Sequence, residues 1–163
     1  MLPTDVVHSP LEGAITIWHC AAYAYNMEWP PQTLLHYPPI FALLGPTELH
    51  KTILKSKNLT HLIQLNPLIP QRIARTYPYF WRVANRSLYI ATSTGIVIKT
   101  INPITNMAHF HFNPATAPEY ATIVKRATLR DPSAKSRLKA AEKICHWFAD
   151  TDLSSVYLQL DLP

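Results

Sequence analysis

The feature that most constrains this chain of 163 residues is its proline content, because fifteen prolines stand against only three glycines. Proline fixes the backbone angle φ near about −65° and lacks an N–H donor, so it starts helices and forms turns but interrupts regular structure. The chain must therefore consist of many short elements with fixed starts. The three glycines are also too scattered to build a phosphate-binding loop, which requires several close together. The sequence predicts no nucleotide cofactor and no other cofactor.

Helical patterns dominate the sequence. Ser9 can cap a helix that begins at Pro10, and Glu12 completes a capping box, so we expect a helix from Pro10 to about Asn26. A short helix over 38–44 is expected to close at Gly45-Pro46. A longer helical region over 70–94 contains Pro78, which either kinks one helix or starts a second. The remaining predicted helices cover residues 59–65, 118–130, 132–149 and 156–160.

The pattern changes after Gly95. Two strand-like runs, residues 96–101 and 107–112, flank a polar five-residue turn and predict a β-hairpin. The expected fold is therefore mainly α with one β-hairpin (α+β), in a single compact domain over residues 1–163.

The charges are segregated along the chain. Residues 1–49 contain four acids and no Lys or Arg, residues 50–143 contain all fifteen basic residues and three acids, and residues 144–163 contain three acids. Such asymmetry favours separate surfaces for different partners. The alternative is that the apolar, acid-only first part is simply the most buried part of the domain.

The basic residues form two clusters that could face a partner or DNA. In the first, steps of 3, 4, 3 and 4 place the side chains on one helix face if the helix continues through Pro78; its members are Arg72, Arg75, Tyr79, Arg82 and Arg86. The second comprises Lys125, Arg126, Arg130, Lys135, Arg137, Lys139 and Lys143. Guanidinium groups bind phosphate or carboxylate bidentately and stack on aromatic rings. The alternative for both clusters is a solvated helix face.

No pattern of residues indicates catalysis, so we expect a protein that is not an enzyme and holds no metal. Three short patterns contain residue types found in metal or catalytic sites: His109-x-His111, Asp150-x-Asp152, and Glu48 three residues before Lys51. The histidines lack a third ligand at recognisable spacing and are expected on the solvent side of the hairpin. Acidic residues such as Asp150 and Asp152 are common after the end of a helix, so they do not by themselves indicate a metal site. Glu48 and Lys51 lack the upstream aspartate on a strand that a metal-nuclease site would need.

The location is expected to be the cytoplasm. Cys20 and Cys145 are far apart in sequence, and two buried thiols in a reducing compartment are favoured over a disulfide. Residues 1–9 contain no basic residue, which argues against a secretory signal. The longest apolar stretch, residues 14–27, is interrupted by His19 and is too short to span a bilayer.

Several segments resemble one known family. The end of the chain, residues 140–149 (AAEKICHWFA) and 155–163 (SVYLQLDLP), resembles an ending in which a Trp-Phe-Ala segment is followed by a short Val-Tyr helix and a terminal proline. Residues 9–12 resemble the family's opening helix, and residues 39–51 are similar to its Leu-Pro-x-x-Leu-His-Lys stretch. Comparable residues also occur at Asn66, Pro67, Arg75, Arg82, Val83 and Ala84.

The family is the middle component of three-component ABC-ATPase systems, the small subunit of Lamassu-type anti-phage defence. The chain departs from it at Cys145-His146, where the family has Gly followed by Lys or Arg. The resemblance implies a non-catalytic subunit that links an SMC/Rad50-like ATPase, which handles DNA, to an effector, commonly a nuclease. The apolar N-terminal part would then pack against one protein partner, and the basic part would face an acidic partner or DNA. The alternative is a stand-alone nucleic-acid-binding protein of winged-helix type, since helices followed by a hairpin have that element order.

Overall fold

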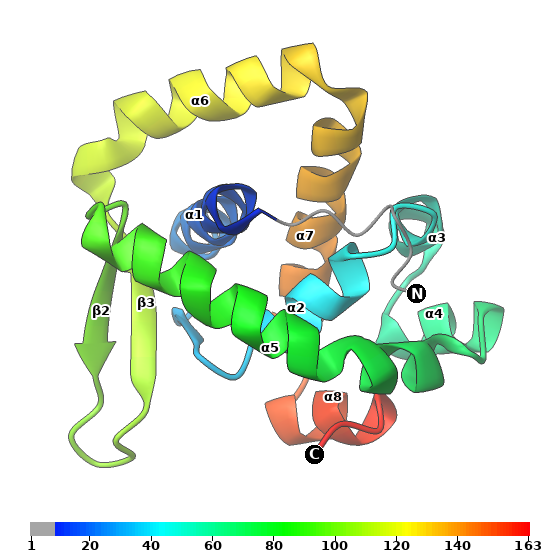
Figure 1. The fold of residues 1–163 in the computed structure, drawn as a ribbon. Helices are drawn as coiled ribbons and strands as arrows, with labels where there is room; N and C mark the ends of the chain where they lie inside the picture. Colours follow the sequence, from blue (N-terminus) through cyan, green and yellow to red (C-terminus); the bar gives the residue numbers. More distant parts are fainter. Residues whose placement is uncertain (1–8) are drawn as a thin grey trace.

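The computed structural model describes residues 9–163, which form eight α-helices and one small antiparallel sheet (Figure 1). This confirms the expected mainly α class. The helices are α1 (Pro10–Asn26), α2 (Tyr37–Leu44), α3 (Leu49–Lys55), α4 (Leu59–Leu65), α5 (Ile69–Ser93), α6 (Ala117–Arg130), α7 (Pro132–Asp150) and α8 (Leu153–Gln159). The strands are β1 (Gln32–Thr33), β2 (Val97–Ile101) and β3 (Ala108–Phe112), and a 3-10 turn, η1 (Pro114–Thr116), precedes α6.

Helix α1 begins where its capping residues predict. The Ser9 hydroxyl accepts a hydrogen bond from the Glu12 backbone N–H at 3.2 Å, and Pro10 occupies the first helical position. Ten of its seventeen residues are buried. All eight residues of α2 are buried as well. Burial within the domain therefore accounts for the apolar character of these two helices without a protein partner.

Helix α5 runs unbroken through Pro78 and packs along α1 and α2 (Figure 1). Pro78 itself is exposed, so its ring projects into solvent instead of the core. The side chains that α5 buries recur at helical spacing and include Ile73, Phe80, Ala84 and Leu88. α5 is therefore one continuous helix with one apolar face, and Pro78 does not start a second helix.

The sheet has one strand more than the sequence predicted. The hairpin strands β2 and β3 pair as expected, with Val97 opposite Phe112 and Ile101 opposite Ala108. The two-residue strand β1 adds to the other edge of β3, which gives the order β1-β3-β2. Phe110 and Phe112 point into the core. The third strand was missed because two residues carry no alternation that could be recognised.

Three further details differ from expectation. Helix α3 was not predicted, because a seven-residue helix that buries only Leu49, His50 and Ile53 shows little periodicity. Helix α8 begins at Leu153 instead of residue 156, with Asp152 preceding its first turn. Gly45 ends α2 in a right-handed helical conformation, φ −54°, and not in the left-handed one usual for a helix-ending glycine. A Cβ there would lie 2.4 Å from Phe80 Cζ, so close packing requires the glycine.

Helix α6 lies over α1 and connects the hairpin to α7 (Figure 1). None of its residues is fully buried. Helix α7 follows from the Asp131 cap, whose carboxylate accepts from the Ser133 N–H, and its predicted apolar face is buried through Leu138, Ala141 and Cys145. None of the helices described is both long and apolar enough to cross a membrane. The expectation of no secretory signal rests largely on residues 1–8, which lie outside the described part.

Candidate anion-binding surface

The first basic cluster lies on the outer side of α5, opposite its buried face. Because α5 is continuous through Pro78, the five side chains of the cluster share one face of the helix, as their spacing predicts. Arg75, Arg82 and Arg86 are exposed, whereas Arg72 and Tyr79 are half-buried. The Tyr79 ring packs edge-on against Phe80, with the ring centroids 5.1 Å apart. Tyr79 is one of the partly buried side chains that pack against the edge of the core.

Arg72 is engaged within the chain. Its guanidinium donates a 2.6 Å hydrogen bond to the Glu48 carboxylate, which joins α5 to the residue preceding α3. This hydrogen bond is the main cause of the lowered pKa of Glu48. Glu48 is thereby an ion-pair partner of Arg72. The cationic side chains of the α5 cluster that remain available are Arg75, Arg82 and Arg86.

A surface cavity of about 300 Å³ opens beside two of these arginines. It is lined by Pro10, Tyr79, Arg82, Val83 and Arg86. Arg82 and Arg86 are one helical turn apart, and neither forms an ion pair with any carboxylate of residues 9–163. The cavity also borders the first turn of α1, the positive end of that helix dipole. Two adjacent guanidinium groups beside an aromatic ring suit a phosphate or carboxylate ligand.

The second basic cluster belongs to other elements. Helix α6 carries the exposed Lys125, Arg126 and Arg130, and α7 carries the exposed Lys135 and Lys139. Helix α6 packs on α7 and α1, whereas α5 packs on α1 and α2, so the two clusters occupy different parts of the domain.

Two members of this second cluster are not freely exposed on the surface. Lys143 donates a 2.7 Å hydrogen bond to the Leu54 carbonyl and so ties α7 to α3. Arg137 is half-buried, with its Nε enclosed and without a hydrogen-bond partner among the described groups. Neither residue is a free surface charge, so the available cations of this cluster are those on α6 and on the outer face of α7.

A polar network that sequence reasoning missed fixes α6 to the domain. His19 on α1 places Nδ1 2.7 Å from the Tyr120 hydroxyl and Nε2 3.1 Å from a Glu142 carboxylate oxygen. Beside it, the Trp18 indole N–H donates to the Thr116 hydroxyl at 3.1 Å. Burial, followed by the Glu142 charge, raises the pKa of Tyr120 to about 12. The only hint in the sequence was a histidine within an otherwise apolar helix.

The candidate metal ligands do not converge. His111 is 2.8 Å from the Thr100 hydroxyl, and His109 lies near His36. Both histidines are partly exposed and alternate with the buried Phe110 and Phe112, so they lie on the face of the strand that is turned away from the core. Asp150 lies 3.3 Å from His146, and Asp152 contacts the Ser154 hydroxyl. Within residues 9–163, no three potential ligands lie together in a metal-binding arrangement.

Comparison with models of known protein families, with curated proteins and with solved structures finds no match to this chain. What the chain can do must therefore be argued from its own side chains and from the motifs in its sequence.

Proposed function

We propose that this chain is a non-catalytic bridging subunit of a bacterial anti-phage defence complex. It would link an SMC/Rad50-like ABC ATPase to an effector subunit of nuclease type. Support comes from the segments of sequence that resemble the middle component of such systems. It also comes from the cavity flanked by Arg82 and Arg86, two cationic side chains without a carboxylate partner in the described chain. This cavity is the observation on which the proposed role depends most.

The cavity suggests how the subunit would bind. Arginine side chains that no internal carboxylate neutralises attract an acidic surface and steer its approach. The opposite face of α5 is committed to the core, so Arg75, Arg82 and Arg86 are held on a rigid helix. Because the helix backbone is already ordered, binding costs no further backbone entropy at these positions. The partner on this face would be an acidic surface of the ATPase or the DNA that the ATPase holds.

Pull-down of the SMC/Rad50-like ATPase of the proposed complex tests the proposal. The double variant Arg82→Gln/Arg86→Gln should weaken capture at least about tenfold, since charged pairs at interfaces contribute about 1.5 kcal/mol or more together. The matched control is Lys57→Gln/Lys99→Gln, which removes the same charge from exposed positions outside α5. Equal loss in both variants, or none in either, would contradict a specific role of α5.

Titration of the isolated chain with duplex DNA distinguishes the bridging function from the alternative, a stand-alone nucleic-acid-binding protein. A stand-alone nucleic-acid-binding protein would bind DNA without the ATPase. Its affinity would fall steeply with salt, and the salt slope would decrease by about one for each phosphate-contacting arginine removed. A bridging subunit binds DNA weakly or not at all unless the ATPase is present.

A further inference from the structure

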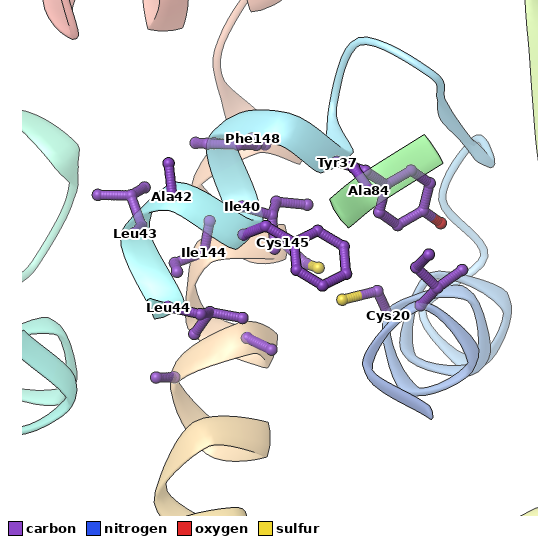
Figure 2. Close-up of a cluster of buried hydrophobic side chains, with 14 of the residues drawn as sticks. Cys20, Tyr37, Ile40, Ala42, Leu43, Leu44, Ala84, Ile144, Cys145 and Phe148 are labelled. Carbon is purple, nitrogen blue, oxygen red and sulfur yellow. The ribbon is translucent and has the colours of Figure 1, made fainter. Parts of the chain in front are cut away.

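The only two cysteines of the sequence meet in the core, where α1 packs against α7. Figure 2 shows the sulfur atoms of Cys20 and Cys145 turned toward each other from the two helices. Both residues are almost completely buried, at 0% and 2% exposure. Hydrogen bonding to Cys20, together with burial, raises the pKa of Cys145 well above its ordinary value. The sequence separation of the two residues gave no sign of this contact.

A small cavity borders one residue of the pair. Its volume is about 200 Å³, and its lining includes Trp29, Gln32, His36, Phe148 and Cys145. A water molecule occupies about 30 Å³ of liquid, so the cavity admits a reagent several times that size. Cys20 is not among the lining residues. The two residues therefore differ, since Cys145 lines a cavity large enough for a small reagent and Cys20 does not.

We propose that Cys20 and Cys145 are a modification site, in which hydrogen peroxide or a small organic hydroperoxide converts the thiol pair into an intrachain disulfide. Cys145 would react first through its thiolate sulfur, which attacks one peroxide oxygen. The O–O bond breaks, Cys145 becomes a sulfenic acid, and the other oxygen leaves as water or an alcohol. The Cys20 sulfur then displaces the sulfenic oxygen, which leaves as a second water, and the S–S bond forms. Two sulfurs are oxidised by two electrons in total, and one peroxide is reduced.

The disulfide would connect α1 covalently to α7. Because it would close a loop that includes most of the chain, it would restrict the unfolded state and raise the melting temperature, by roughly 5–15 °C for a domain of this size. Reaction should take minutes to hours in millimolar peroxide, since only the thiolate is nucleophilic and burial disfavours it. Dithiothreitol should reverse both the bond and the thermal shift.

The test uses the purified full chain, reduced, freed of reductant and treated with hydrogen peroxide at pH 8. Intact mass should fall by about 2 Da, peptide mapping should join Cys20 to Cys145, and the melting temperature should rise until dithiothreitol is added. Cys20→Ala should leave a sulfenic acid on Cys145 that dimedone traps, whereas Cys145→Ala should remain unmodified. Should either variant fold poorly, the mass and mapping of the unmodified sequence still decide the question.

The proposal fails if the folded chain keeps its mass. It also fails if peroxide only adds oxygen atoms without forming the bond, if the cysteines join separate molecules, or if the disulfide appears only in urea. The last outcome would show that the two sulfurs are not placed to react in the folded domain.

Discussion

Replacing Gly13 by Ala should destabilise the domain, although alanine is the better helix former. Gly13 lies in α1 where this helix packs against α5, the most extensive helix pair of the fold. A Cβ at this position would lie 2.0 Å from Ser87 Oγ, 2.8 Å from Ser87 Cβ and 3.2 Å from Phe41 Cε1. The hydroxyl can rotate away, but Ser87 Cβ is fixed to the backbone and Phe41 is fully buried. The two helices must therefore move apart.

The magnitude follows from two opposing terms. Overpacking a tight core costs about 1–3 kcal/mol, and the gain in helix propensity from Gly to Ala is about 1 kcal/mol. Because the Cβ–Cβ contact demands a backbone shift, we expect the upper part of this range and a net loss of about 1–2 kcal/mol. Removing Ser87 Oγ and Cβ with Ser87→Gly should relieve the clash. The double variant should then be more stable than the sum of the single changes by about 1 kcal/mol or more.

Urea unfolding followed by tryptophan fluorescence measures these differences, and an unchanged m-value would indicate that the unfolded state is unaffected. A further substitution at Ser87 provides a second check. Ser87 Oγ is buried without a hydrogen-bond partner among the described groups, so Ser87→Ala should be neutral or stabilising by up to about 1 kcal/mol. If Gly13→Ala stabilises the chain, or if the effects of Gly13→Ala and Ser87→Gly simply add, close packing between α1 and Ser87 does not require the glycine.

Three other predictions concern individual interactions. Tyr157→Phe should cost about 1 kcal/mol in urea unfolding, because its hydroxyl donates to the Leu35 carbonyl at 2.7 Å; an unchanged midpoint would contradict this. Burial lowers the pKa of His36 to about 4, below its ordinary 6.5, so the unfolded chain binds this proton first as pH falls. The free energy of unfolding should therefore decrease by about 2 kcal/mol as the pH falls from 6.5 to 4, after allowing for partial exposure of the ring. Urea titrations at several pH values should show a weaker dependence of this free energy on pH for His36→Gln. Arg72→Gln should cost less than about 1 kcal/mol, since its ion pair with Glu48 is exposed on both sides, and a larger loss would show that the pair has a greater structural role.

Local signals in the sequence predicted much of the fold. Asp131 followed by Pro132, and apolar residues spaced by four and three, were sufficient to predict α7 and its buried face. The continuity of α5 was not predictable, because Pro78 is compatible with either a kink or a new helix. Only packing along α1 and α2 selects the unbroken form. The role of Gly45 was equally hidden, since it depends on Phe80, thirty-five positions later in the chain.

The sequence predicted which basic side chains share a face of the candidate site, but not which side chains pair with residues elsewhere in the chain. Helical spacing placed Arg82 and Arg86 on one face, and the structure adds the cavity between them and the start of α1. The hydrogen bond between Arg72 and Glu48 and the contact between His19 and Tyr120 each join residues that are far apart in sequence. Such contacts leave no periodicity, so they become visible only once the chain is folded.

Reconstitution with and without this chain tests the bridging role most directly. The SMC/Rad50-like ATPase and the effector of the proposed complex would be co-expressed in both conditions and separated by size-exclusion chromatography. A bridge predicts that the ATPase and the effector co-elute only when this chain is present, and that it elutes with them. If the two co-elute equally well without it, or if this chain elutes alone as a folded monomer, it does not link them.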